Sequence, residues 1–386
     1  MTKACPVCRS EDLLEVFARD GVPVNQNIVF DDAEAAANIA MRDVRLLHCA
    51  ACDFVFNGAF DPDAVAYDER YDNAQLDSPA YAAYIDGLVA YMLDECGLRA
   101  ARVLEVGCGK GEFLRRLVGA PGSAVRGLGF DPSYTGPQSD LDGRWIVEQR
   151  YFSPGIEHFE TDAILCRHVI EHMPDPRAFV RSIVEAAAGS PAARYFFETP
   201  SVEWILDERA FWDVFYEHCN YWSERSLRRV YEEAGLHVDG LRRIWHDQFL
   251  WIEGRRGSPT DAKTTAEGSD LRERLLAFAR AEATQRDRLL AEMTSGSGTI
   301  ALWGAAAKGV TLANLLDPDR RLIDCLIDIN PNKQDKHVAG SGHPIVAPAT
   351  AVARGVERIY VMNPNYLLEC ERMLRSLGSS ADLRNV

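Results

Sequence analysis

Residues 103–114 read VLEVGCGKGEFL. An apolar segment typical of a β-strand runs directly into three glycines at alternate positions, and a segment typical of a helix follows. Glycine lets a bound molecule approach the main chain where a side chain would clash, and the first turn of a helix offers free amide N–H groups. The stretch therefore predicts a strand, a glycine turn and a helix that bind a small molecule at the turn.

Two acidic residues accompany this turn. Glu105 precedes the first glycine, Gly107, by two positions and can reach the cationic amino group of a bound amino-acid moiety. Asp131 closes the next predicted strand, where a carboxylate can accept both hydroxyl groups of a ribose. A dinucleotide-binding turn would have a third glycine three residues after Gly109, whereas Gly111 comes two residues after it.

The combination resembles the S-adenosylmethionine site of the class I methyltransferases. The resemblance implies that S-adenosylmethionine is the cofactor and that it is bound by Glu105, Gly107, Gly109, Gly111 and Asp131. Residues 167–174 (RHVIEHMP) follow the fourth predicted strand and resemble the superfamily segment that lies beside the transferring methyl group. His172 and His168 are therefore candidate catalytic residues, and His168 is also a candidate for contact with the cofactor. Two histidines that merely cap the next helix are the open alternative.

The surrounding chain alternates short apolar runs with helical stretches from residue 101 to about 255. Strands are predicted at 102–106, 125–130, 145–147, 163–166 and 195–198, and helices at 111–118, 176–187 and 224–234. Such alternation is typical of an α/β fold with a mostly parallel sheet and helices on both faces. Residues 61–100 are expected to be helical as well, either as a lid or as plain packing.

Four of the ten cysteines form two pairs with metal-knuckle spacing, Cys5 with Cys8 and Cys49 with Cys52. Each pair lets two thiolates face one cation from a tight turn, and two pairs complete a tetrahedral shell for Zn²⁺. The sequence therefore predicts a closed, structural zinc site, with four unrelated thiols or one redox pair as the alternatives. His48 adjoins Cys49 and is expected to be a bystander.

A second, smaller α/β pattern lies in the C-terminal part. A polar segment at 254–268 precedes one long helix at 270–294, which Asp270 and Glu273 open in the manner of a capping box. Strands at 300–303, 322–328 and 358–362 and a helix ending at Leu316 then predict a Rossmann-like domain. The expected division is a zinc-binding domain at 1–60, a methyltransferase domain at 61–255, a linker with connecting helix at 256–296 and a Rossmann-like domain at 297–386.

Composition restricts the function further. The 386 residues exceed a typical domain of ~150 residues, and 47% apolar with 26% charged residues is ordinary for a soluble globular protein. The net charge of −16 disfavours nucleic acid and anionic membranes as partners. The sequence contains no run of ~18 apolar residues, which is the length that spans a bilayer, and its first residues lack the apolar core of a signal peptide. We therefore expect a cytoplasmic protein with a small-molecule substrate and no obligate protein partner.

A third cluster of reactive side chains occupies residues 211–223, FWDVFYEHCNYWS. Tyr216, Glu217 and His218 are adjacent there and can supply a base, a donor and an orienting group. An aromatic-rich loop whose polar groups satisfy one another is the alternative. His246, before the next apolar run, is a further candidate.

The Rossmann-like domain carries its own candidate site. Small residues and Lys308, at the start of the helix that follows residues 303–309 (WGAAAKG), could bind an anion. Residues 328–334 (DINPNKQ) could form a second anion site or an ordinary turn. Lys308, Asn363 and His246 are the candidate substrate-binding residues.

From Cys5 to about Pro348 the chain resembles the sugar C-methyltransferases of deoxysugar biosynthesis. These combine a four-cysteine zinc domain, a central S-adenosylmethionine domain and a C-terminal Rossmann-like domain. The resemblance implies a nucleotide-linked 4-keto sugar as substrate, a base that removes the proton beside the ketone, and attack of the enolate on the sulfonium methyl. It implies that His218 is the base, that His172 and Glu217 support it, and that the C-terminal domain binds the nucleotide.

Three positions depart from that family. Phe215 stands where the family has a tyrosine three residues before its histidine, with Tyr216 one step along; His168 stands where it has an asparagine; and His246 is followed by Asp-Gln instead of two glycines. O- or N-methylation of another small metabolite therefore stays open. An rRNA substrate, which the net charge disfavours, and a scaffold with a vestigial cofactor site are further alternatives.

Overall fold

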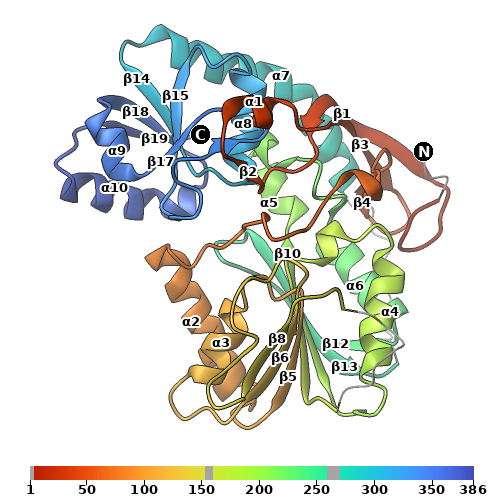
Figure 1. The fold of residues 1–386 in the computed structure, drawn as a ribbon. Coiled ribbons are helices and arrows are strands. Elements are labelled where there is room, and N and C mark those ends of the chain that lie inside the picture. The colour runs from red at the N-terminus through yellow and green to blue at the C-terminus, as the bar shows by residue number, and fades with distance from the viewer. Residues whose placement is uncertain (1–3, 153–159, 259–269) are drawn as a thin grey trace.

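The computed structural model describes residues 4–152, 160–258 and 270–386. Figure 1 shows three parts: a central sheet at the bottom, an N-terminal part at the upper right and a C-terminal part at the upper left. Among the described residues, no helix is both long enough and apolar enough to cross a membrane.

The central sheet has eight strands in the order β12-β13-β10-β9-β5-β6-β8-β7. The five middle strands from β10 to β8 are parallel, and β13, β12 and β7 pair antiparallel with their neighbours. Their bounds are β5 Arg102–Val106, β6 Arg126–Phe130, β7 Ser139–Asp140, β8 Trp145–Glu148, β9 Ala163–Arg167, β10 Arg194–Pro200, β12 Leu236–Ile244 and β13 Phe249–Arg256. Helices α2 (Pro79–Asp94) and α3 (Glu112–Gly119) cover one face, and α4 (Pro176–Ala186) and α6 (Glu224–Glu233) cover the other (Figure 1).

The predicted α/β fold is confirmed. The strands expected at 102–106, 125–130, 145–147, 163–166 and 195–198 are β5, β6, β8, β9 and β10, to within two residues at each end. The three expected helices are α3, α4 and α6. These elements are recognisable in the sequence because the middle strands are buried on both faces and therefore read as continuous apolar runs.

Three details differ from the expectation. Residues 61–78 are not α-helical: only a short 3₁₀ turn at Pro62–Ala64 forms, and α2 begins at Pro79 because Ser78 caps it. The capping box at Asp270 is wrong, since its side chain makes no capping hydrogen bond to α7 (Leu271–Ser295). β13 extends to Arg256, and the expected polar linker at 254–268 otherwise lies mostly outside the described residues.

The N-terminal sheet is completed by a strand from far along the chain. Its order is β1-β3-β4-β11, with β1 Leu13–Pro23, β3 Met41–Cys49, β4 Val55–Asn57 and β11 Asn220–Tyr221. A second link pairs β2 (Val29–Phe30), which precedes the short helix α1 (Ala33–Ala37), with β16 (His337–Val338) of the C-terminal part. The N-terminal part is therefore hydrogen-bonded to both other parts.

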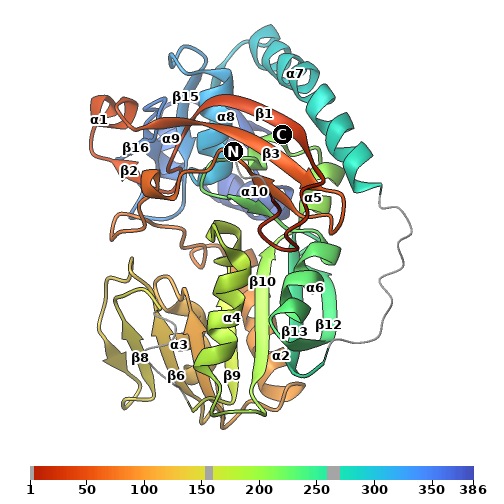
Figure 2. The ribbon, with the colours of Figure 1, turned by 90° about the vertical axis from the view of Figure 1, so that its right-hand side faces the viewer.

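The C-terminal sheet is parallel throughout, in the order β17-β15-β14-β18-β19. Its strands are β14 Thr299–Trp303, β15 Ile323–Ile327, β17 Ile345–Val346, β18 Val356–Val361 and β19 Asp382–Asn385. Helices α8 (Ala307–Leu316), α9 (Pro348–Ala353) and α10 (Leu367–Ser376) accompany them, and Figure 2 shows the long α7 along the outside. This is the Rossmann-like arrangement that the alternating pattern predicted.

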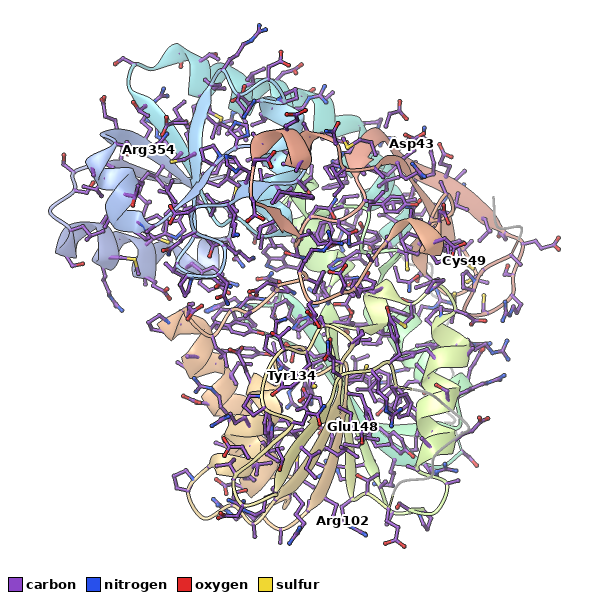
Figure 3. All side chains as sticks on the ribbon, in the orientation of Figure 1. Asp43, Cys49, Arg102, Tyr134, Glu148 and Arg354 are labelled. Carbon is purple, nitrogen blue, oxygen red and sulfur yellow. The ribbon has the colours of Figure 1, made fainter. Side chains whose placement is uncertain are left out.

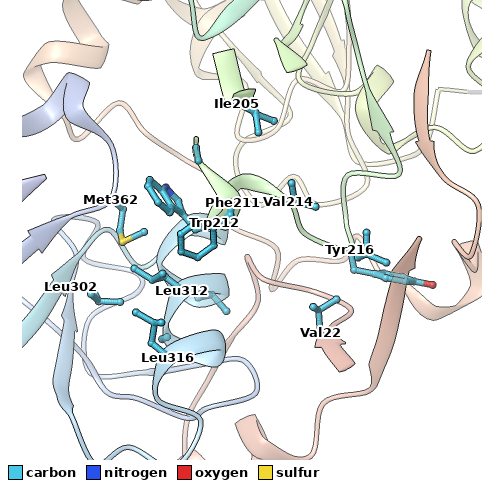
Figure 4. Close-up of a cluster of buried hydrophobic side chains, with 14 of the residues drawn as sticks. Val22, Ile205, Phe211, Trp212, Val214, Tyr216, Leu302, Leu312, Leu316 and Met362 are labelled. Carbon is cyan, nitrogen blue, oxygen red and sulfur yellow. The ribbon is translucent and has the colours of Figure 1, made fainter. Parts of the chain in front are cut away.

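One apolar cluster joins the three parts (Figure 4). Val22 enters it from β1, Phe211 and Trp212 from the loop that precedes β11, and Leu302 and Leu312 from β14 and α8. Helix α5 (Val202–Asp207) and the inner side of α7 add further buried side chains. Because these residues share one core, the three parts are held in a fixed relation by packing.

Candidate active site

The parallel strands present their carboxyl ends to the other two parts. Figure 3 shows Arg102, at the start of β5, at the outer edge of the sheet, and Glu148, at the end of β8, nearer the junction. Ligands of open α/β sheets bind at the carboxyl ends of the strands. Two pockets occur at this edge.

The first, the glycine-turn pocket, is lined by Glu105, Gly107, Gly109 and Asp131. The second, the interdomain pocket, runs from His218 to Lys308 and Lys333 of the C-terminal part. Both pockets share five lining residues, which are Asn73, Ala74, Gln75, His168 and His172. These five residues form a shared wall between the pockets. A group transferred from a ligand in one pocket to a ligand in the other would therefore pass two histidines.

The glycines of the turn have different roles. All three have a positive φ, between 55° and 72°. A side chain at Gly107 would collide with Val169, and one at Gly111 would collide with the ring of Trp145. A Cβ at Gly109 would meet nothing and would point into open space. Gly107 and Gly109 border the pocket, whereas Gly111 begins α3 behind it and does not line it.

Glu105 and Asp131 fit two parts of S-adenosylmethionine, the amino group of its amino-acid moiety and its ribose hydroxyls. Glu105 is fully buried, one of its carboxylate oxygens has no hydrogen-bond partner, and burial raises its pKa to about 8. Such a group gains a partner when a cationic amino group binds. Asp131 accepts hydrogen bonds from the Gly109 N–H (2.8 Å) and from the Ser133 N–H (2.8 Å), which orients the carboxylate at the pocket. The donor set of the glycine-turn pocket therefore suits the cofactor.

His168 is a charged group in the shared wall. It has a left-handed φ of 54°, and its Nε2 lies 3.1 Å from a Glu198 carboxylate oxygen that also accepts from Tyr84. Burial lowers the pKa of His168, but Glu198 and Glu171 outweigh burial and raise it to about 9. Arg167 pairs with the other oxygen of Glu198 at 2.7 Å, and Glu171 lies 3.5 Å from His168, so two cations face two carboxylates. A protonated His168 is an orienting group and cannot accept a proton at neutral pH.

His172 and His218 face each other in the interdomain pocket. Their ring centroids are 4.9 Å apart, and Phe215 packs on His218 at 4.1 Å. His172 Nδ1 lies 2.9 Å from both the Tyr67 hydroxyl and the Glu217 carbonyl oxygen. Burial, with a smaller contribution from His172, lowers the pKa of His218 well below its usual range. His218 is therefore neutral and can accept a proton.

The other two residues of the expected cluster point elsewhere. The buried carboxylate of Glu217 accepts hydrogen bonds from Asn25, Gln26 and Asn27, and it lines neither pocket. Tyr216 also lines neither pocket, because its hydroxyl accepts from the Asp61 N–H at 2.8 Å. Glu217 thus fixes the N-terminal segment beside the pocket, and the structure does not bring Tyr216 to it.

Of the three residues expected to bind the substrate, two line the interdomain pocket and one does not. Lys308 lines the interdomain pocket, but it already donates to Asp213 at 2.7 Å and lies over the ring of Trp204. Asn363 lines the pocket and donates to Gln248 at 3.0 Å. His246 is exposed in the turn between β12 and β13 and lines neither pocket.

The four cysteine sulfurs converge in the N-terminal part. They lie within 4.8 Å of one another, with 3.7 Å between Cys5 and Cys52 and 3.5 Å between Cys8 and Cys49. Tetrahedral thiolates at about 2.3 Å from Zn²⁺ would be about 3.8 Å apart. His48 pairs with Asp53 at 3.1 Å and stands outside the cluster, as a bystander would.

The two knuckles share one backbone geometry. The residue after the second cysteine, Arg9 or Asp53, has a positive φ. Its N–H donates to the main-chain carbonyl oxygen of the first cysteine of its pair, Cys5 or Cys49. The donor distances are 3.0 Å and 2.9 Å. Glu171, His172 and His218 form a second group of potential metal ligands, and their ligand atoms also lie within 4.8 Å of one another.

The comparisons with known proteins all point to methyltransferases. A model described as a C-methyltransferase C-terminal domain matches residues 262–379, and a methyltransferase-domain model matches residues 76–240. C-methyltransferase NovU of Streptomyces niveus is 24% identical over 95% of this chain and 90% of its own length. The chain contains a methyltransferase domain followed by a C-methyltransferase C-terminal domain. It is a methyltransferase enzyme that uses S-adenosylmethionine, with the glycine-turn pocket in the matched domain.

Three further proteins that this methyltransferase resembles match only part of it. The ubiquinone biosynthesis O-methyltransferase of Escherichia coli O7:K1 is 32% identical over 27% of this chain and 44% of its own length. A methyltransferase structure from Aquifex aeolicus is 20% identical and covers 50% of this chain and 98% of its own, with a TM-score of 0.37. The 1,6-didemethyltoxoflavin-N1-methyltransferase of Burkholderia thailandensis is 16% identical and covers 55% and 99%, also with a TM-score of 0.37.

Two pocket residues of the methyltransferase were not singled out from the sequence. Gln248 lines the interdomain pocket and is held by the side-chain amides of Asn363 and Asn365. His246, two residues earlier, was predicted instead, because an imidazole can act as an acid or a base and an amide cannot. Lys333 lies in the 328–334 segment that was considered as an anion site, so its signal was present in the sequence.

Proposed function

We propose that this methyltransferase transfers a methyl group to a carbon atom of a nucleotide-linked keto sugar, with His218 as the base. The observation that carries this proposal is the shared wall of the two pockets. His172 and His168 line both pockets, and His218 lines the interdomain pocket beside them. A carbon acceptor needs a base at this position, because a C–H bond next to a ketone must lose its proton before it can attack a methyl group.

His218 has the properties that this base requires. Its half-buried ring packs on Phe215 and is neutral at pH 7, because desolvation lowers its pKa. The proton moves from the acceptor carbon to an imidazole nitrogen of His218, and the electron pair is left as an enolate. The enolate carbon then forms the new C–C bond as the sulfur–methyl bond of the bound cofactor breaks. S-adenosylmethionine supplies the electrophilic methyl group for that step.

Neighbouring residues position the base and the ketone. His172 is fixed by Tyr67 and by the Glu217 carbonyl, so its ring stays against His218. His168 carries a positive charge in the same wall and would stabilise negative charge that develops on the ketone oxygen. Glu217 acts through the 25–27 segment, which is a positioning role.

We also propose that the four cysteines bind one structural Zn²⁺. The second knuckle continues into β4, and β4 pairs with β11, which begins two residues after His218. The Asn57 N–H donates to the Cys219 carbonyl at 2.8 Å. Arg225, at the start of α6, pairs with Asp53 of the same knuckle at 2.9 Å. The metal would therefore fix the segment that carries the base.

Deuterium exchange at the acceptor carbon isolates the proton-transfer step. The enzyme is incubated in D₂O with S-adenosylhomocysteine and a panel of nucleotide-linked 4-keto sugars, so that no methyl transfer occurs. The wild type should exchange the proton beside the ketone, and His218→Gln should lose on the order of 10²-fold or more of that rate. His237→Gln, the same replacement on β12 outside both pockets, should exchange at the wild-type rate.

Two outcomes would contradict parts of the proposal. Equal exchange by the wild type and His218→Gln would make His218 a structural residue and would move the base to His172. If no keto sugar exchanges with the wild type, carbon is the wrong acceptor atom, and O- or N-methylation of another metabolite takes its place.

A further inference from the structure

Gln248 presents an amide nitrogen without a partner to the interdomain pocket. Only 6% of the residue is exposed, and it lines the pocket. Its Oε1 accepts hydrogen bonds from Nδ2 of Asn363 and Nδ2 of Asn365, both at 3.0 Å. Its Nε2 has no hydrogen-bond partner in the described parts of the chain, and it is not one of the partnerless atoms that the protein seals off. The N–H groups of this amide are therefore open to a ligand in the pocket.

A series of hydrogen bonds determines which end of the amide faces the pocket. Asn363 Oδ1 accepts from the Asn365 N–H at 3.1 Å, so Nδ2 of Asn363 is the atom turned toward Gln248. Nδ2 of Asn365 also lies 3.5 Å from the carbonyl oxygen of Trp245, which can only accept. Two donors thus meet the Gln248 side chain, and they require an acceptor opposite them. The oxygen of Gln248 is engaged, and its nitrogen is left for the pocket.

The turn between β12 and β13 that precedes this residue has an unfavourable backbone. Trp245, His246 and Asp247 all have a left-handed φ, of 51°, 54° and 63°. Residues with a Cβ avoid this region, bulky ones above all. The Trp245 ring packs on Tyr84 at 4.7 Å and on Tyr366 at 6.0 Å, which holds the turn in place. Backbone strain that the surrounding structure maintains in this way is concentrated at functional sites.

Gln248 lies next to the wall that the two pockets share. Its carbonyl oxygen accepts from the Ser201 N–H at 3.0 Å, and the next residue, Phe249, pairs with Pro200 at the end of β10. The Phe249 ring packs on His168 of the shared wall, with 4.6 Å between the ring centroids. The atom that receives the methyl group must lie at this wall, so an oxygen on the neighbouring carbon would lie close to these side chains.

His168 supplies positive charge at the wall, but its N–H groups are directed elsewhere. Its Nε2 lies 3.1 Å from Glu198, and its Nδ1 lies 3.5 Å from Glu171. Both ring nitrogens therefore face carboxylates of the protein. Negative charge that develops on an oxygen is stabilised best by a preorganised N–H that points at that oxygen. The fixed amide of Gln248 offers such an N–H beside the charged imidazole.

We infer that Gln248 donates a hydrogen bond from Nε2 to the ketone oxygen of the acceptor and stabilises the enolate that forms there. The inference rests on the proposed function, because it needs a ketone and a base. Negative charge grows on the oxygen as His218 takes the proton from carbon, and it disappears when the enolate carbon takes the methyl group and the ketone is restored. No bond forms or breaks at Gln248. The chain has Asp247 and Gln248 where the sugar C-methyltransferases that it resembles have two glycines, so the resemblance does not supply this donor.

Deuterium exchange with saturating S-adenosylhomocysteine tests the donor, using the keto sugar that the wild type exchanges fastest. Gln248→Glu replaces Nε2 with an acceptor oxygen, while the other oxygen can still accept from Asn363 and Asn365. Its maximal exchange rate should fall on the order of 10²-fold, and its affinity for S-adenosylhomocysteine should stay close to that of the wild type. Gln248→Met adds no charge and should lose a similar factor, which separates loss of the donor from repulsion of the enolate.

Two further variants serve as controls. Gln138→Glu makes the same replacement at an exposed glutamine outside both pockets and should exchange at the wild-type rate. Asn365→Ala removes one of the two donors that orient the Gln248 amide, at a residue that does not line the interdomain pocket. It should lower the maximal exchange rate by less than Gln248→Glu does and leave the KM for the keto sugar nearly unchanged.

The outcomes distinguish this inference from the proposed function. If the wild type and both Gln248 variants share one maximal exchange rate, the inference is wrong and the proposed function stands, and a rise in KM alone would assign Gln248 to another group of the sugar. If both variants also lose affinity for S-adenosylhomocysteine, Gln248 is a structural residue and the inference is again wrong. If the wild type exchanges no keto sugar, the inference and the proposed function are both overturned.

Discussion

The imidazole ring of His172 stands edge-on to the ring of His218, with 4.9 Å between the ring centroids. His172 is fixed by two hydrogen-bonding neighbours, whereas the ring of His218 is held by packing on Phe215. Two imidazoles at this distance disfavour a proton on each other, which supports a neutral His218 at physiological pH.

The pH dependence of turnover should reflect this neutral base. Burial, with contributions from His172, His168 and Lys308, lowers the pKa of His218 well below 6.5. A base must be unprotonated, so kcat/KM for the acceptor, measured at saturating S-adenosylmethionine, should stay level from pH 8 down to pH 6.5 and fall only at lower pH. A pH profile of kcat/KM measures this, and an acid limb centred at or above pH 6.5 would contradict the assignment of His218.

His168→Asn should change the pH dependence of stability. Asparagine tolerates the left-handed backbone, so the substitution removes mainly the charge. A pKa raised from 6.5 to about 9 contributes roughly 3 kcal/mol that is complete below pH 6.5 and is lost as the pH rises through 9. Urea unfolding at pH 6 and pH 10 should show the variant far less stable at the lower pH and close to the wild type at the higher one. A pH-independent difference between the two proteins would mean that His168 is not charged in the fold.

Cofactor binding should release a proton from Glu105. Burial holds the pKa of the free carboxyl near 8, and the bound amino group requires the carboxylate. The affinity for S-adenosylhomocysteine should therefore rise between pH 6 and pH 8, by up to about tenfold per unit. Calorimetry at pH 7 in buffers of different ionisation enthalpy counts the proton. Glu105→Gln should bind more weakly with no such pH dependence, and identical pH profiles for the two proteins would place the amino group elsewhere.

Asp131→Ala should weaken cofactor binding. The change removes a carboxylate that would accept the ribose hydroxyls, at a cost of about 1.5–3 kcal/mol for a charged hydrogen bond. That corresponds to roughly tenfold or more in the dissociation constant of S-adenosylhomocysteine. Asp142→Ala, an exposed aspartate in the loop after β7, is the matched control. Unchanged affinity of Asp131→Ala would show that the ribose lies elsewhere.

Elemental analysis of protein purified without added metal should find one Zn²⁺ per chain. Cys49→Ser should lose it, and deuterium exchange at the acceptor carbon should fall with it, because β4 supports the segment next to His218. Cys370→Ser, at a buried cysteine of α10 outside the cluster, should keep the metal. A metal-free yet folded N-terminal part would overturn the zinc proposal. Two metal ions per chain would point to the group of Glu171, His172 and His218 and would make His218 a ligand.

Local features of the fold could be predicted from the sequence. The strand, glycine turn and helix around Gly107 are readable because apolar runs and positive φ angles leave residue-level signs. The cysteine knuckles are readable for the same reason, since their spacing is local. The predicted strands lie within about two residues of β5, β6, β8, β9 and β10 in the central part and of β14, β15 and β18 in the C-terminal part, whereas β7, β12, β13, β17 and β19 were not predicted.

Relationships between distant segments could not be predicted. Glu217 was expected to orient His218, but its carboxylate binds residues 25–27, which lie about 190 positions away in the chain. Lys308 was predicted to bind an anion of the substrate, but its ammonium group pairs with Asp213. Residues 61–78 were expected to be helical, yet Asp72 instead accepts hydrogen bonds from Asn330 and Asn332 of the C-terminal part. Each outcome depends on which surfaces meet, and a single sequence does not contain that information.

The apolar cluster of Figure 4 has a consequence for recombination between relatives. A crossover between β13 and α7 would exchange the C-terminal part, which lines one side of the interdomain pocket, and this is an obvious way to alter the substrate. In this protein the exchange would also separate Phe211 and Trp212 from Leu302 and Leu312, which pack against them. Chimeras should therefore fold only when both parents carry complementary side chains at this junction. New substrate preferences would then arise more readily from point changes along the interdomain pocket than from swapping whole parts.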